Sequence, residues 1–319
     1  PYKRKFTRVG IEQANRTGHQ MKRVVVTGMG TVSALDNDWS EVCARLQARR
    51  NAIRYMTEWD EYEGLFTRLG GPVDDFEKPA HYSRKKIRTM GRVALMATRA
   101  SELALEAAGL LDDPILGSGR VGVSYGSSTG STDAIADFGN MLINKQTAGL
   151  NATSYIRMMG HTAPVNIGVF FGLKGRIYTT SSACTSSSQG IGYGYEAVRN
   201  GEQTLMVCGG GEELCATEAA VFDTLYATST RNDAPDTTPR PFDKDRDGLV
   251  IGEGACTLIL EEMEHAKARG ATIYAEILGF ATNSDGMHVT QPDLESICRV
   301  LQMSLDNAGV SASDIGYVS

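Results

Sequence analysis

The stretch that decides the fold is Gly175-Arg-Ile-Tyr-Thr-Thr-Ser-Ser-Ala-Cys184-Thr-Ser-Ser-Ser-Gln-Gly-Ile-Gly-Tyr-Gly194. Residues 177–180 are β-branched or aromatic, which predicts the end of a strand. A helix is expected to follow from Thr185 to about Asn200, with Gly201 as its C-terminal cap. The stretch therefore predicts a strand-to-helix turn with Cys184 at the point where the helix begins.

A cysteine in this position has the properties of a nucleophile. The positive end of the helix dipole and the unpaired N–H groups favour the thiolate form of Cys184. The same N–H groups can hold an oxyanion during acyl transfer, as in a nucleophile elbow with sulfur in place of the serine oxygen. The alternative is a small buried residue, which is the usual role of a lone cysteine.

Three glycines in the expected helix favour the nucleophile. Gly190, Gly192 and Gly194 are unfavourable in a helix interior, so they indicate a helix that is closely approached in a packed interior. We therefore expect a buried, central helix and an acyl-accepting Cys184. Of the six cysteines, only Cys184 is expected to lie at a helix N-terminus.

Composition excludes several classes of protein. The 319 residues are 41% hydrophobic, which is enough for a large core and one or two domains. A net charge of −6 does not indicate a surface that binds nucleic acid. The sequence has no run of 18 apolar residues, so no membrane span is expected. The cysteines form no CxxC pair, which is typical of reduced thiols in a cytoplasmic protein rather than of disulfides or zinc ligands.

The remaining pattern alternates strands and helices. Strands are expected at 23–27, 121–125, 177–180, 204–207, 255–261 and 273–280, and helices at 39–49, 92–108, 133–144, 161–171, 185–200 and 293–308. Gly28-Met-Gly30 is expected to be a tight turn, Gly209-Gly-Gly211 the end of a strand, and residues 315–319 the beginning of another. Ser33 replaces the third glycine of a dinucleotide fingerprint, so that function is rejected.

An acidic loop imitates a calcium site. Asp243, Asp245 and Asp247 have the spacing of calcium ligands, but the twelfth position is Gly254 and Glu253 falls one residue early. We expect no metal here, and interpret the loop as a scaffold held by salt bridges.

Several motifs together resemble the β-ketoacyl–acyl-carrier-protein synthases. They are Val24-Val-Val-Thr-Gly-Met-Gly30, Ser182-Ala-Cys184-Thr-Ser, Thr228-Ser-Thr-Arg-Asn-Asp233, Arg240-Pro-Phe-Asp-Lys-Asp-Arg-Asp-Gly248, Gly252-Glu-Gly254 and Glu264-His-Ala-Lys-Ala-Arg-Gly270. The resemblance covers about residues 21–319 and is nearest to the type II elongating synthases, particularly those of aryl-polyene gene clusters.

The resemblance implies an α/β fold, the thiolase-like αβαβα layered sandwich, with the C-terminal half incomplete in this chain. It divides the chain into a basic N-terminal extension at 1–20, a domain at 21–262 that carries the nucleophile, and the start of a C-terminal domain at 263–319. It also implies a homodimer or a synthase heterodimer.

The chemistry implied is a decarboxylating Claisen condensation without a cofactor or metal. An acyl group passes from acyl carrier protein to Cys184, whose backbone N–H is also an oxyanion donor. Malonyl-carrier protein then loses carbon dioxide, and its carbanion attacks the thioester to give a β-ketoacyl product of fatty acid or polyene biosynthesis. Thr129 matches the gate of the family's acyl pocket, and Phe222 matches a wall of that pocket.

Two catalytic histidines, a lysine and a phenylalanine loop of the family would lie beyond Ser319, and His265 and His288 do not match the histidine motifs. The expectation is that this chain is acylated but does not complete the condensation. Two alternatives remain: a non-catalytic partner subunit resembling a chain-length factor, which would usually lack the cysteine, and a thiolase that uses coenzyme A.

Overall fold

The computed structural model describes residues 21–288 and 290–319; the N-terminal extension expected at 1–20 lies outside the described residues. Its strands are β1 (Val24–Ser33), β2 (Arg54–Tyr55), β3 (Leu69–Gly71), β4 (Val121–Gly126), β5 (Ile177–Thr180), β6 (Leu205–Glu212), β7 (Ile251–Gly252), β8 (Gly254–Glu262) and β9 (Ala275–Ile277). Its α-helices are α1 (Trp39–Gln47), α2 (Arg84–Ile87), α3 (Arg92–Ala107), α4 (Thr132–Asn144), α5 (Ala152–Met158), α6 (Thr162–Phe171), α7 (Ser186–Arg199), α8 (Ala216–Thr224), α9 (Met263–Ala268) and α10 (Leu294–Ala308).

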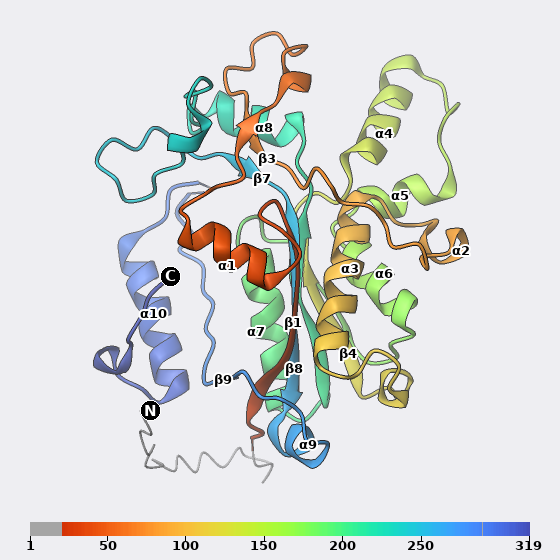
Figure 1. The fold of residues 1–319 in the computed structure, drawn as a ribbon, viewed down its shortest axis with the longest axis vertical. Helices are drawn as coiled ribbons and strands as arrows, with labels where there is room; N and C mark the ends of the chain where they lie inside the picture. Colours follow the sequence, from red (N-terminus) through yellow and green to blue (C-terminus); the bar gives the residue numbers. More distant parts are fainter. Residues whose placement is uncertain (1–20, 289) are drawn as a thin grey trace.

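A mixed six-stranded sheet in the order β5–β4–β6–β8–β1–β9 forms the centre of the molecule (Figure 1). Strand β4 is parallel to β5 and β6, whereas β8 is antiparallel to both β6 and β1. A smaller sheet, β2–β3–β7, lies at the end of the molecule where α8 is found. The parallel strands β4, β5 and β6 all end at the same edge, so the loops that follow them meet there.

Helices cover both faces of the large sheet. Figure 1 shows α3 and α6 on one face and α7 on the other. On the α3 face, Val93, Met96 and Ala100 are fully buried with Val123 of β4. On the opposite face, Tyr195 and Val198 of α7 belong to a second buried cluster with Met206 and Cys208 of β6. The described part of the chain thus has helix, sheet and helix layers, as an α/β protein should.

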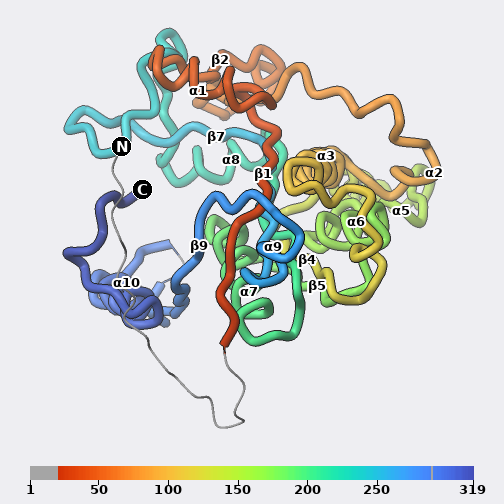
Figure 2. The backbone as a smooth tube through the Cα atoms, turned by 60° about the horizontal axis from the view of Figure 1, so that its bottom comes forward, coloured from red at the N-terminus to blue at the C-terminus, as the bar shows by residue number. Residues whose placement is uncertain are grey.

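Helix α7 is the buried central helix that the sequence predicts, and its glycines explain why. A Cβ added at Gly190 would lie 2.9 Å from the carbonyl oxygen of Gly209, so the helix approaches the sheet backbone closely. On its other side, a Cβ at Gly192 would lie 2.2 Å from the ring of Phe280. Figure 2 shows α10 beyond α7, on the side away from α3.

The first strand corrects one prediction. Gly28-Met-Gly30 is not a tight turn, because β1 continues through it to Ser33 with a bulge between Val26 and Gly28. These glycines let the strand touch α3: a Cβ at Gly28 would lie 2.2 Å from the oxygen of Ala104, and one at Gly30 would lie 2.2 Å from the oxygen of Ala100. Their purpose is close packing rather than chain reversal.

The glycine run at 209–211, which is expected to end a strand, is the last part of β6, and the strand ends one residue later at Glu212. A Cβ at Gly210 would lie 1.8 Å from the Oγ of Ser187, so this run admits α7.

Other differences are unpredicted helices and shifted segment ends. Helices α2, α5 and α8 fall outside the predicted helices, strand β9 is shorter than the predicted 273–280, and no strand forms at 315–319 within the described chain. The predicted domain boundary after residue 262 falls between β8 and α9 and stays a prediction. In the described ranges, no helix combines the length and apolar character needed to cross a membrane.

Candidate active site

The turn between β5 and α7 holds Cys184 in a fixed backbone. Ala183 has φ +52°, a left-handed conformation that a side chain adopts at a cost. The Ser186 hydroxyl donates a hydrogen bond to the oxygen of Ala183 over 2.7 Å, and the N–H of Ser182 donates to Ser186 Oγ over 2.9 Å. These bonds oppose the strain and keep the turn in one conformation.

Cys184 is exposed and precedes Thr185, the N-cap residue of α7. Its thiol therefore lies near the positive end of the helix dipole. No described residue accepts a hydrogen bond from the Cys184 backbone N–H. That N–H remains available for an oxygen atom of a bound acyl group.

A cavity of about 630 Å³ opens beside this turn. Cys184, Thr129 and Phe222, the three residues singled out from the sequence, all line it. They come from the β5–α7 turn, the loop after β4 and helix α8, which are well separated in the chain. The size is sufficient for a small acyl chain.

The cavity also holds two carboxyl groups that the sequence reasoning missed, Glu212 at the end of β6 and Glu218 on α8. Oε1 of Glu212 and Oε1 of Glu218 each lie 3.1 Å from the hydroxyl oxygen of Thr129. Burial, followed by the nearby charge of Glu212, raises the pKa of Glu218 to about 7. In the sequence, the acidic pair Glu212-Glu213 directly after the glycine run was the signal that could have indicated a carboxyl group here.

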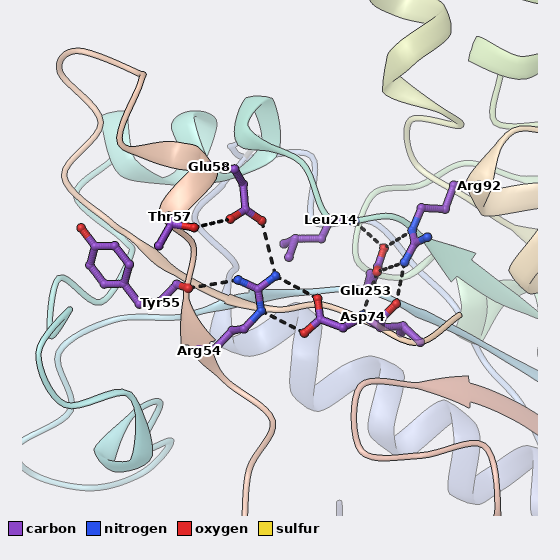
Figure 3. Close-up of polar contacts among 9 residues, drawn as sticks. Arg54, Tyr55, Thr57, Glu58, Asp74, Arg92, Leu214 and Glu253 are labelled. Carbon is purple, nitrogen blue, oxygen red and sulfur yellow. Dashed lines mark hydrogen bonds and ion pairs between the residues drawn. The ribbon is translucent and has the colours of Figure 1, made fainter. Parts of the chain in front are cut away.

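Glu253, within the Gly252-Glu-Gly254 motif, anchors the β8 side of the cavity. Its carboxylate accepts hydrogen bonds from the Arg92 side chain over 2.5 and 2.9 Å and from the N–H groups of Val73 and Leu214 over 2.8 and 3.2 Å (Figure 3). A more exposed pair, Arg54 with Asp74, lies nearby in the same view. Because the Glu253 side chain is only 2% exposed, this bonding fixes the start of β8, whose Gly254, Ala255 and Cys256 line the cavity.

The other cysteines require one correction. Cys184 is not alone at a helix N-terminus, because Cys215 is the N-cap residue of α8. The Sγ of Cys215 lies 3.0 Å from the hydroxyl oxygen of Thr217, and Cys215 does not line the cavity. Cys256 does line the cavity, but burial raises the pKa of its thiol. Burial also raises the pKa of the Cys208 thiol, which is inaccessible.

The acidic loop behaves as the scaffold that the sequence predicts. Asp247 lies 3.6 Å from Arg231 and 3.5 Å from Arg240, and it accepts a hydrogen bond from Ser229. No group of residues suited to hold a metal ion occurs in the described ranges.

The described histidines are also away from the cavity. His265 contacts Glu261 over 2.6 Å, His288 contacts Thr290, and no histidine is among the described residues that line the cavity.

Known proteins match most of the described chain. Residues 21–266 match the family model "Beta-ketoacyl synthase, N-terminal domain", and residues 274–319 match "Beta-ketoacyl synthase, C-terminal domain". A 3-oxoacyl-[acyl-carrier-protein] synthase 2 of Synechocystis is 34% identical, over 94% of this chain and 72% of that protein. A 3-oxoacyl-[acyl-carrier-protein] synthase 1 of Escherichia coli K12 is 36% identical, over 89% of this chain and 70% of that protein.

Solved structures give the same result. A β-ketoacyl synthase from Burkholderia phymatum is 57% identical with a TM-score of 0.92, over 93% of this chain and 73% of that one. The ishigamide ketosynthase/chain length factor is 32% identical with a TM-score of 0.83, over 94% of this chain and 73% of that one. These neighbours confirm the thiolase-like α/β fold. The chain therefore belongs to the β-ketoacyl synthase family and is an acyltransferase of the condensing-enzyme class.

Proposed function

We propose that Cys184 is the acyl-accepting nucleophile of this synthase. The observation that carries the proposal is an exposed thiol at the N-terminal end of a buried helix, opening onto a cavity of about 630 Å³. In the proposed reaction, the thiolate attacks the acyl thioester on a carrier protein, and the carrier's thiol leaves. Malonyl-carrier protein then releases carbon dioxide, and the resulting carbanion displaces Cys184 to form the β-ketoacyl product.

The Cys184 backbone N–H is proposed as one donor to the oxyanion that forms in both acyl transfers. Its support is the lack of a described acceptor for this N–H. A donor aligned with the developing charge stabilises the transition state more than the ground state.

Thr129 and Phe222 are proposed to contact the acyl chain. Both line the Cys184 cavity, together with apolar Val32, Val221 and Ala255. An acyl chain in this cavity would bury apolar surface while its thioester remains at Cys184. The fatty acid or aryl-polyene pathway stays a prediction.

The proposed partners are an acyl carrier protein and a second synthase chain. A neighbour of 27% identity and TM-score 0.78 is described as AntDE:AntF, a type II polyketide-synthase acyl carrier protein in complex with its ketosynthase. A homodimer or heterodimer is supported by β5, an edge strand whose Ile177 is 46% exposed, and by Val169 of α6, which packs against β5 and is 73% exposed at this residue. An edge with free backbone groups and apolar side chains is suited to pairing with another strand. The proposed location is the cytoplasm.

Acyl transfer to the chain tests the nucleophile directly. The protein is mixed with an acyl-carrier protein, and its intact mass and peptide map are followed with time. One acyl group on the peptide that contains Cys184 is expected, and none on the Cys184→Ser variant. The matched variant Cys215→Ala should be acylated at the rate of the unmodified chain. Acyl transfer that persists in Cys184→Ser would contradict the assignment, and a chain that accepts no acyl group would favour the partner-subunit alternative.

A further inference from the structure

The cavity beside Cys184 has an unusual polar wall. Thr129, Glu212 and Glu218 meet there through oxygen–oxygen distances of 3.1 Å, although much of the remaining lining is apolar. An apolar acyl chain would gain nothing from this group and would remove its carboxyl oxygens from water. The presence of these three polar side chains therefore has to be explained by what binds in the cavity.

The protons of the group determine what it offers to a ligand. Thr129 has one hydroxyl proton but lies at hydrogen-bond distance from both carboxyl groups, so it cannot donate to both. Glu212 also accepts from the Ser127 hydroxyl over 2.9 Å and the Ser128 N–H over 2.5 Å, so both of its oxygens already act as acceptors. Thr129 then donates to Glu212, and Glu218 must supply the proton of the second bond.

This arrangement leaves one acceptor without a partner. With its proton on Oε1, directed to Thr129, neutral Glu218 presents Oε2 as a carbonyl-type oxygen. Among the described residues, no donor reaches Oε2, and this atom is not one of the buried polar atoms closed to solvent. The raised pKa of Glu218 agrees with the neutral form.

We propose that Glu218 is a specificity residue that selects acyl chains bearing a hydroxyl group, which donates a hydrogen bond to Glu218 Oε2. The hydroxyl lies along the chain, away from the thioester carbonyl at Cys184. Glu212 and Thr129 act as positioning residues, because they hold the Glu218 proton away from the ligand. The proposal rests on the proposed function, since it takes this cavity as the acyl pocket.

Binding of non-transferable analogues tests the proposal without acyl transfer. The probes are pantetheine thioethers with hexyl, octyl and decyl chains, each with and without a terminal hydroxyl, and calorimetry measures their dissociation constants. At the best-fitting length, the hydroxylated probe should bind about threefold to tenfold more tightly than its unsubstituted partner. Glu218→Leu should remove or reverse this preference. Glu218→Gln, which keeps an acceptor oxygen, should retain part of it.

The exposed Glu106→Leu on α3 is the matched control and should keep the full preference. Equal binding of both probes at every length, or a preference that survives Glu218→Leu, would overturn the proposal. In parallel, thioesters of the same chains are tested for acylation of Cys184. A hydroxyl preference in binding without acylation would refute the nucleophile and leave this inference standing. Acylation of Cys184 together with equal binding of the two probes would support the nucleophile and refute this inference.

Discussion

Helices α7 and α8 each have a cysteine at or just before the N-cap position and both form walls of the same cavity, yet they are built differently. Helix α7 is largely buried, and its Gly190 and Gly194 lie against the sheet. Helix α8 is partly exposed: Val221 and Leu225 are 58% and 55% accessible. Cys184 opens onto the cavity, whereas the thiol of Cys215, the N-cap residue of α8, contacts the Thr217 hydroxyl. A position at a helix N-terminus is therefore not sufficient to make a cysteine a nucleophile. The thiol must also face a cavity and be held there by a rigid element.

The largest expected effect separates the two cysteines. Cys184→Ala should reduce acyl transfer from a carrier protein by about a hundredfold or more, because it removes the attacking sulfur. Cys215→Ala should change the rate by less than about twofold, because its thiol does not line the cavity. Initial rates from intact mass measure both. Similar losses in the two variants would remove the distinction between the helices.

The next expected effect concerns packing. Gly190→Leu should lower the free energy of unfolding by about 1–3 kcal/mol or more, since its side chain would collide with the backbone of β6. On α8, Thr217→Leu at an exposed position should change it by about 0.5 kcal/mol or less. Denaturant melts compare the two. An unchanged midpoint for Gly190→Leu would contradict the close contact of α7 with the sheet.

A smaller effect tests the part of the cavity wall that Thr129 forms. Thr129→Phe should slow acylation by long-chain thioesters about tenfold more than by short ones, because the ring fills the cavity near the acyl chain. The ratio of rates for butyryl and decanoyl thioesters gives the result, with Thr129→Ser as the conservative control. Equal slowing of the two thioesters would refute the gate while leaving Cys184 intact.

The smallest expected effect is the pH dependence that Glu218, on α8, gives to the free energy of unfolding. Its folded pKa of about 7 lies above the usual 4.5, so the folded state binds this proton more tightly. Its stabilising contribution is full below about pH 4.5 and is lost as the pH rises through about 7. Glu218→Gln should therefore gain stability relative to the unmodified chain between about pH 5 and pH 8. We expect on the order of 1 kcal/mol, after discounting for the part of the side chain that solvent reaches.

The titratable groups around Glu218 are Glu212 and Glu213, which act by charge, and the cavity thiols of Cys184 and Cys256. Glu106→Gln is the exposed control, for which no such pH trend is expected. Melting curves across this range measure the difference. A difference between Glu218→Gln and the unmodified chain that does not vary with pH would show that Glu218 is not held neutral.

The elements around Cys184 and the family could be predicted from the sequence alone. The β-branched run at 177–180, the small residues around Cys184 and the cap at Gly201 predicted β5, the turn and α7 nearly to the residue. These predictions succeed because strand propensity, capping and helix periodicity act between residues that are near one another in the chain.

The role of Gly28 and Gly30 and the presence of a polar wall in the cavity became visible only in the folded structure. Gly28 and Gly30 read locally as a turn, but their purpose is contact with α3, about 70 residues further along the chain. The chemistry of Glu218 likewise depends on Thr129 and Glu212, which reach it from two other segments. A close approach or a shared proton is a property of groups brought together by folding, so a local pattern in the sequence does not record it.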